Sequence, residues 1–187
     1  MENKFLDNLL QTLEVDLPQR ESLDEFLELI IPEIRKWGED LYETEYYSQQ
    51  GGKPWLEFRD EDNFHNTVLH FFNEGSEYLK STDGNVIRGK WRLLENTNKM
   101  IIESGNNTEL FELAFLNSTF FILRKHGEQQ RRRKYLVLGY EPATSGLEWL
   151  DYVELLFNIV RANNRKVQVT TAAIIIVILI VLILSVF

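Results

Sequence analysis

The chain has 187 residues, contains no cysteine and carries a formal net charge of −9 at pH 7. Without cysteine, disulfides, thiolate metal sites and thiol nucleophiles are all excluded. Residues 1–50 hold 13 acidic and 4 basic residues, so the whole net charge arises in this segment. Because an acidic surface repels phosphate backbones, we expect no binding of nucleic acid.

Residues 1–50 are predicted to form an acidic helical segment. Apolar residues recur at helical spacing over residues 5–13 and indicate a first short helix. A second helix begins after Ser22, an N-cap whose capping-box partner is Glu25, and Pro32 is expected to kink it. The chain starts without the basic and apolar regions of a secretory signal, so we expect no export.

The second helix, over residues 22–41, has one apolar face and one acidic face. The apolar face is formed by Leu23, Phe26, Leu27, Ile30, Ile34, Trp37 and Leu41. Two interpretations remain open: the face packs on the helix's own domain, or it binds in the groove of a protein partner.

From Trp55 to Tyr140 the apolar period changes to two, and turn residues become frequent, which is typical of antiparallel strands. Strands are predicted at 55–59, 67–72, 77–81, 86–94, 99–103, 109–116, 119–125 and 134–140. The links are short and rich in turn residues, such as Asp83-Gly84, so neighbouring strands are expected to pair as a meander.

Two strands have a predicted buried face. Trp91 lies between two basic residues, so its side chain is expected in the core of the sheet. Phe111, Leu113 and Phe115 alternate with Glu112 and a small residue, so these three are expected on one buried side.

Residues 146–163 return to helical spacing and predict an amphipathic helix across the sheet or its open end. Its apolar side is formed by Leu147, Leu150, Val153, Leu156, Phe157 and Val160. The expected organisation is a helical segment 1–50, a β domain 51–145, a helix and connector 146–168, and an anchor 169–187.

The anchor has no charged residue and, as a helix of 19 residues, would extend about 28 Å, close to the thickness of a hydrocarbon core. Arg161, Arg165 and Lys166 precede it, so the positive-inside rule places the folded domain in the cytoplasm. The chain therefore resembles a tail-anchored protein, and we expect a single span in a bacterial inner membrane.

Catalytic and metal-binding patterns are absent from the sequence. His65, His70 and His126 do not stand in a ligand or triad pattern, and no phosphate-binding loop or nucleophile elbow is found. We therefore predict no catalytic residue, no metal site and no cofactor.

A basic loop is predicted between the last two strands. It is formed by Arg124, Lys125, Arg131, Arg132, Arg133 and Lys134. Either this loop balances the acidic helices as a solvated turn, or it contacts anionic lipid headgroups.

Residues 70–125 resemble small bacterial lipocalin-like domains. The resemblance is carried by Phe72-Asn73 with a turn at Gly75, the Gly89-x-Trp91 strand, and the three apolar strands that follow. It implies a meandering barrel or half-barrel with a possible apolar interior and no named activity.

The expected fold is α+β, with N-terminal helices, an antiparallel meander or lipocalin-like partial barrel of about seven or eight strands, an amphipathic helix and one transmembrane helix. The expected function is a non-enzymatic, single-pass membrane protein whose cytoplasmic domain binds a partner or small apolar ligand near the membrane. Two alternatives stay open: a scaffolding subunit that uses helix 22–41, and an enzyme with a carboxylate-based site.

Overall fold

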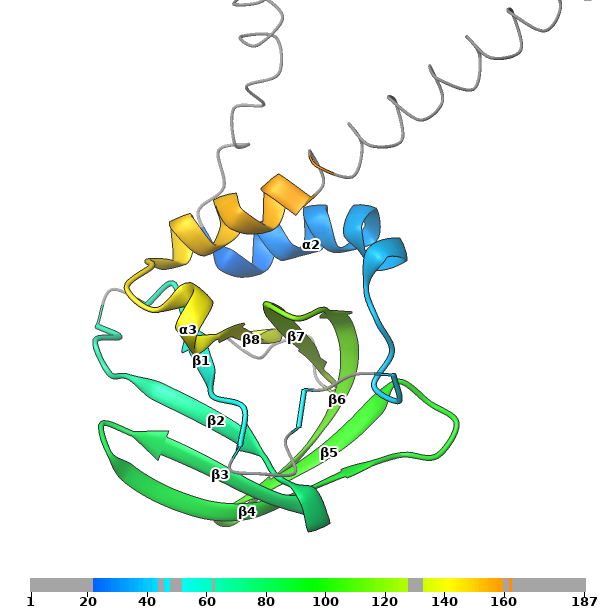
Figure 1. Cartoon of the computed structure of the whole chain (residues 1–187), viewed down its shortest axis with the longest axis vertical. Helices are drawn as coiled ribbons and strands as arrows, with labels where there is room; N and C mark the ends of the chain where they lie inside the picture. Colours follow the sequence, from blue (N-terminus) through cyan, green and yellow to red (C-terminus); the bar gives the residue numbers. More distant parts are fainter. Residues whose placement is uncertain are drawn as a thin grey trace, which may run out of the picture.

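The computed structural model describes residues 22–43, 46–47, 52–61, 63–127, 133–159 and 162. The fold is α+β, and its antiparallel strands pair in chain order and close into an eight-stranded barrel (Figure 1). The strands are β1 (Trp55–Phe58), β2 (Val68–Phe72), β3 (Glu77–Thr82), β4 (Asn85–Leu93), β5 (Lys99–Ser104), β6 (Asn107–Leu116), β7 (Phe120–Lys125) and β8 (Tyr135–Tyr140). All eight predicted strands and the meander order are confirmed, with ends that differ by two residues or fewer.

Local turn chemistry explains this agreement. Asp83 and Gly84 both have positive φ, 48° and 86°, and they join β3 to β4 in a two-residue turn. A turn of this kind matches the right-handed twist of the flanking strands and therefore sets their register. The predicted hairpin at this position is confirmed.

Helix α2 (Leu23–Ile34) begins as predicted. The hydroxyl of Ser22 accepts a hydrogen bond from the backbone N–H of Glu25 at 3.3 Å. A second cap comes from the loop after β1, where a carboxylate oxygen of Asp60 accepts from the N–H of Leu23 at 2.7 Å. The helix is therefore positioned on the barrel at its first turn as well as through its apolar face.

The helix ends earlier than the sequence predicts. A 3-10 turn, η1 (Arg35–Trp37), follows α2, and Gly38 is already extended. The prediction that Leu41 continues the apolar stripe is therefore wrong. Leu41 instead packs inside the barrel, since the chain leaves the helix and crosses to the barrel end.

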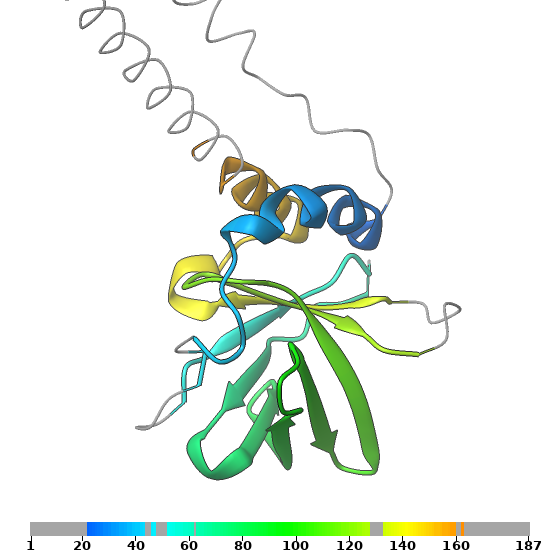
Figure 2. The ribbon, with the colours of Figure 1, turned by 90° about the vertical axis from the view of Figure 1, so that its right-hand side faces the viewer.

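A further helix over residues 149–159 lies beside α2 on the outside of the barrel (Figures 1 and 2). The ring of Phe26 contacts those of Trp149 and Phe157, with centroids 6.0 and 6.5 Å apart. This agrees with the prediction of a helix that packs across the sheet.

The residues around the start of this helix differ from the prediction. A short helix, α3 (Glu141–Thr144), precedes it, and the longer helix begins at residue 149 rather than 146. Leu150 is 45% exposed, so its assignment to the apolar side is wrong. Tyr152 is buried instead and donates its hydroxyl hydrogen to the carbonyl of Leu138 at 3.0 Å.

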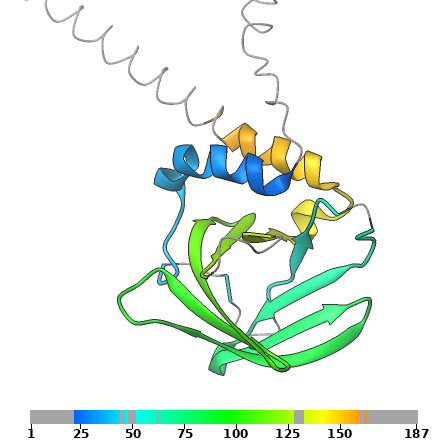
Figure 3. The ribbon, with the colours of Figure 1, turned by 180° about the vertical axis from the view of Figure 1, so that it is seen from behind.

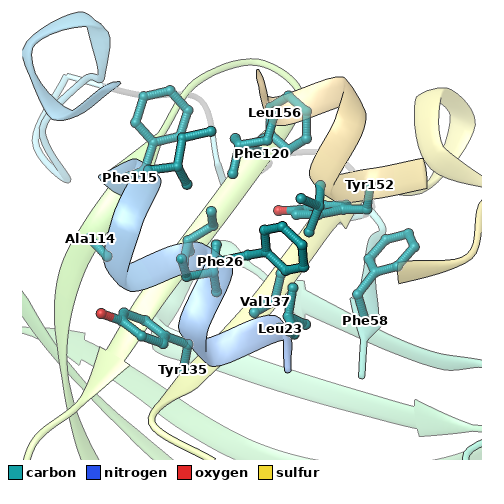
Figure 4. Close-up of a cluster of buried hydrophobic side chains, with 14 of the residues drawn as sticks. Leu23, Phe26, Phe58, Ala114, Phe115, Phe120, Tyr135, Val137, Tyr152 and Leu156 are labelled. Carbon is teal, nitrogen blue, oxygen red and sulfur yellow. The ribbon is translucent and has the colours of Figure 1, made fainter. Parts of the chain in front are cut away.

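An outer core lies between the two helices and the outer wall of the barrel (Figure 4). The strand side chains come from β1, β6, β7 and β8, and the helix side chains come from both helices. Its buried members are Leu23, Phe26, Leu27, Ile30, Ile34, Phe58, Ala114, Phe115, Phe120, Ile122, Tyr135, Val137, Tyr152, Val153 and Leu156.

An inner core fills the barrel. Its buried members are Leu41, Tyr46, Trp55, Phe72, Tyr78, Trp91, Met100, Ile102, Phe111, Leu113, Leu116, Phe121, Leu123, Leu136 and Leu138. Trp91 is 8% exposed while Lys90 and Arg92 are exposed, so its predicted burial is confirmed.

A bulge in β6 divides one predicted face between the two cores. The pairing register with β7 shifts between Leu113 and Phe115. Phe111 and Leu113 therefore face the interior, whereas Phe115 lies in the outer core near α2. The predicted common side for these three residues is wrong for Phe115, because the extra residue reverses the alternation.

Several predicted segments lie outside the described residues. These are the first helix at 5–13, Val160 of the amphipathic helix, the connector 161–168 apart from residue 162, and the anchor 169–187. Among the residues that the structure describes, no helix has the length and apolar character needed to cross a bilayer.

Candidate functional site

The two ends of the barrel interior differ in chemistry. At the end where β1 begins and β2 finishes, the inward side chains are Trp55 and Phe72. Two residues further along each strand, toward the other end, the buried positions hold Glu57 and His70. The interior therefore has an aromatic end and a charged end.

Tyr46, from the segment between η1 and β1, fills the aromatic end. Its side chain is 0% exposed, and its ring lies 5.2, 5.6 and 6.0 Å from the rings of Phe121, Trp91 and Phe72. The indole N–H of Trp55 donates to the carbonyl of Tyr46 at 2.9 Å. A side chain from outside the strands thus occupies the space that the strands enclose.

The hydroxyl of Tyr46 is buried and has no hydrogen-bond partner among the described residues. Burial raises the pKa of this hydroxyl, with smaller contributions from Tyr47 and Tyr42, so it is neutral at pH 7. An unpaired buried hydroxyl costs about 1–3 kcal/mol. The packing of the ring must offset this cost.

A chain of three hydrogen-bonded side chains occupies the charged end. Nδ1 of His70 lies 2.5 Å from the hydroxyl of Tyr78, and Nε2 lies 2.9 Å from a carboxylate oxygen of Glu57. A neutral imidazole with its hydrogen on Nε2 satisfies all three groups, since it donates to Glu57 and accepts from Tyr78. The three residues are 2–6% exposed.

The protonation states follow from burial and charge. Burial lowers the pKa of His70, against the opposing effect of Glu57, and keeps the imidazole neutral. Burial alone would raise the pKa of Glu57. However, the hydrogen bonds from His70 and Arg59 and the charge of Arg59 outweigh burial, so the pKa of this carboxyl is well below its usual range. Glu57 is therefore ionised inside the barrel.

Basic side chains surround this carboxylate. Nε of Arg59 lies 2.7 Å and Nη1 of Arg133 lies 3.3 Å from one of its oxygens, and Nζ of Lys80 is 4.0 Å from the other. Nearby, Lys125 and Glu109 form a separate ion pair at 3.8 Å. One buried carboxylate is therefore in contact with cations from the residue after β1, from β3 and from the approach to β8.

The network lies beside the shortest backbone ladder of the barrel. β1 pairs with β2 only at Trp55↔His70 and Leu56↔Leu69, and the hydrogen bond from His70 to Glu57 adds a side-chain contact between the two strands. An imidazole between a phenol and a carboxylate could pass a proton. In this structure Glu57 is paired to two arginines, and the side chains of Glu57, His70 and Tyr78 are all buried inside the barrel.

A cleft of about 370 Å³ lies outside the barrel wall, between the β1–β2 loop and residues 147–149. Its acidic side chains include Asp60, which caps α2, and Glu61, which pairs with Arg133 at 3.3 Å. Phe64 and Trp149 supply apolar walls. Two carboxylates of the cleft, Asp60 and Glu61, are thus engaged in structural contacts.

The predicted basic loop divides into different environments. Arg133 pairs with Glu57 and Glu61, and Lys134 pairs with Glu28 of α2 at 2.5 Å. The backbone N–H of Lys134 also donates to Asp24 at 2.7 Å. These contacts agree with the charge-balancing interpretation.

The other bases of this loop are placed differently. Lys125 is the partner of Glu109, and Arg124 is exposed. Arg131 and Arg132 lie outside the described residues, so the contact with headgroups stays a prediction. The juxtamembrane Arg161, Arg165 and Lys166 also lie outside them.

The predicted partner-binding face of the second helix lies in the outer core. Leu23, Phe26, Leu27, Ile30 and Ile34 are buried there. Trp37 is half-buried against the same core. The chain's own barrel therefore covers this face, as the first of the two interpretations expects.

Sequence reasoning missed that Glu57, His70 and Tyr78 are neighbours and that Tyr46 fills the aromatic end. The alternation of inward positions could have indicated the charged end, since Glu57 is two residues after Trp55 in the same strand. No signal in the sequence indicates Tyr46, because its position depends on the path of a loop. Among the described residues, no cluster of His, Asp and Glu could hold a metal ion.

No protein-family model, curated protein or solved structure matches the chain. The motif positions of the lipocalin-like resemblance nevertheless contact one another. The indole N–H of Trp91 donates to the carbonyl of Asn73 at 2.9 Å. At Gly89 a Cβ would lie 1.9 Å from the carbonyl oxygen of Glu103, so only glycine allows β5 to approach β4 here.

Proposed function

We propose that the protein is a non-enzymatic, single-pass membrane protein whose cytoplasmic barrel binds another protein through its outer surface. The observation that carries this proposal is the occupied interior. Tyr46 packs into the aromatic end, and Glu57, His70 and Tyr78 pack into the charged end. An eight-stranded barrel has room for side chains or for one small ligand, and here side chains take that room.

The position of the helix layer supports an orientation at the membrane. Only residues 163–168 separate Ala162 from the predicted anchor, and six residues extend at most about 22 Å. The helix over 149–159 would therefore lie near the bilayer. β3 and β4 lie on the opposite side of the barrel, where a cytoplasmic partner has access (Figures 1 and 3).

Kinship with lipocalin-like domains is part of the proposal. It is supported by the closed eight-stranded meander and by the contact between Trp91 and Asn73. The absence of an enzymatic role is supported by the ion pairs of Glu57 and Glu61, which leave these carboxylates committed to structure.

Photo-crosslinking from inside and outside the barrel tests this proposal against the ligand-binding alternative. Met100 is one of only two methionines and is buried inside, so photo-methionine reports on the interior without disturbing it. We expect Met100 to crosslink only to its own chain in living cells. A small-molecule adduct on the Met100 peptide would overturn the proposal in favour of a ligand.

The outer surface is tested with a photo-reactive phenylalanine at Ile101, next to Met100 on β5, and at the exposed Leu29 of α2 as the control. We expect one protein adduct of defined mass from Ile101 and none from Leu29. Absence of a protein adduct from Ile101, or equal adducts from both positions, would contradict partner binding through the barrel wall.

A further inference from the structure

The β3–β4 hairpin extends beyond its neighbour β5. β4 pairs with β3 along its length, from Thr82↔Asn85 to Glu77↔Lys90. It pairs with β5 only from Gly89↔Ser104 onward. Among the described strands, none pairs with the second edge of residues 85–88. Alternate backbone N–H and C=O groups on this edge therefore lack a strand partner.

The open edge is held in place from the other side of the hairpin. The N–H of Asp83 donates to the carbonyl of Thr67 at 3.0 Å, and its carboxylate accepts from the N–H of Thr67 at 2.8 Å. Asn66 also donates to this carboxylate. Since the turn is tied to the β1–β2 loop, the edge is preorganised before anything binds to it.

The side chains of this edge suit strand pairing. Val86 is 57% exposed and Ile87 is 49% exposed, and both are β-branched. Soluble proteins protect open edges with charged side chains, proline or bulges; segment 85–88 contains no proline or bulge, and its one charged residue is Arg88. An extended edge with two exposed β-branched side chains is a structural template for adding a strand from another chain.

The charges beside the open edge indicate which kind of partner strand would bind there. Lys90 lies between Glu77 and Glu103 on the neighbouring strands, so acidic residues already face it. Arg88 lies opposite Leu79, and on its other side β5 is absent. In a second copy of this chain, residues 85–88 include no acidic side chain that could face this Arg88. A foreign strand can supply the carboxylate, and opposite charges across a strand pair are stabilising.

We propose that the open edge of β4, Asn85–Arg88, binds an extended segment of a partner protein by strand addition. The segment carries an acidic residue that faces Arg88 and apolar residues that cover Val86 and Ile87. This inference rests on the proposed function and names its surface and its partner chemistry. The location agrees with that function, because the hairpin lies on the side of the barrel away from the helices (Figure 3).

Three synthetic peptides test the binding mode on the full chain in nanodiscs. The first is a fluorescein-labelled octapeptide of alternating valine and threonine with one central glutamate. The second has lysine in place of glutamate, and the third has methyl groups on alternate backbone nitrogens. We expect saturable binding by fluorescence anisotropy for the first, at least tenfold weaker binding for the second, and none for the third.

A charge swap tests the position. Arg88→Glu should lower the affinity for the glutamate peptide at least tenfold and raise the affinity for the lysine peptide by a similar factor. The matched control is Arg92→Glu, on the same strand and face but beside β5, which should change either affinity less than twofold. Both residues are exposed, so thermal unfolding should show that both variants remain folded.

Equal binding of the first two peptides, no effect of backbone methylation, or equal losses in the two variants would overturn the inference. The crosslink from Ile101 separates this failure from that of the proposed function. If Arg88→Glu leaves the Ile101 adduct at its original yield, the partner does not bind at the open edge of β4, and the proposed function stands. If the original chain gives no adduct, the proposed function itself fails.

Discussion

His70, which pairs with Trp55 in the short β1–β2 ladder, donates its Nε2–H to the carboxylate of Glu57, the first β1 residue after that ladder, at 2.9 Å. This buried, charge-assisted hydrogen bond adds to the two backbone pairs that join β1 and β2. Because Arg59 and Arg133 also bind Glu57, the contact joins both neighbours of β1 at the charged end of the barrel.

Removal of this carboxylate should destabilise the barrel strongly. Glu57→Ala leaves Arg59, Arg133 and the imidazole of His70 without their shared acceptor, and breaking a buried charge pair costs about 3–5 kcal/mol. Urea unfolding followed by tryptophan fluorescence measures the change. The control Glu112→Ala, at an exposed position of β6, should alter the free energy of unfolding by less than about 0.5 kcal/mol.

Stability should fall as the pH is lowered. His70 has a pKa near 6.5 in the unfolded chain and a lower pKa in the folded protein, so the unfolded state binds more protons below pH 6.5. The lowered pKa of Glu57 adds a further loss below about pH 4.5. The free energy of unfolding should therefore be highest above pH 6.5.

Urea titrations at pH 7.5, 6.0 and 5.0 measure this dependence. His70→Gln keeps a donor toward Glu57 and cannot be protonated, so it should flatten the decline between pH 7.5 and 5.0. His65→Gln, in the exposed β1–β2 loop, should retain the decline. If the free energy of unfolding of His70→Gln falls with pH as steeply as that of the original chain, groups other than His70 cause the pH dependence.

The unpaired hydroxyl of Tyr46 predicts a stabilising substitution. Tyr46→Phe keeps the ring contacts and removes the buried hydroxyl without a partner, so stability should rise by about 1 kcal/mol. Tyr152→Phe is the matched control, because it removes a hydroxyl that donates to Leu138, and it should lower stability by about 1 kcal/mol. Thermal unfolding should show shifts of opposite sign, and shifts of the same sign would contradict this account.

The anchor prediction concerns the uncharged run over residues 169–187. The full chain should sediment with membranes and resist carbonate extraction, since about 20 apolar residues can span a bilayer. A variant without residues 167–187 should appear in the soluble fraction. Full-length chain recovered in the soluble fraction would reject the anchor and, with it, the proposed orientation.

Local sequence patterns determined the strands, their order and the start of α2. Alternation of apolar residues, the Asp83-Gly84 turn and the Ser22 cap act within a few residues, so their consequences are readable before the fold is known. The burial of Trp91 was readable for the same reason, because its strand neighbours are basic.

Tertiary structure alone decided which core each side chain enters. The bulge after Leu113 sends Phe115 outward to α2, and the path after Gly38 carries Leu41 and Tyr46 into the barrel. The open edge of β4 likewise depends on where β5 begins to pair. These outcomes depend on contacts between residues far apart in the chain, where packing between whole elements overrides the local period.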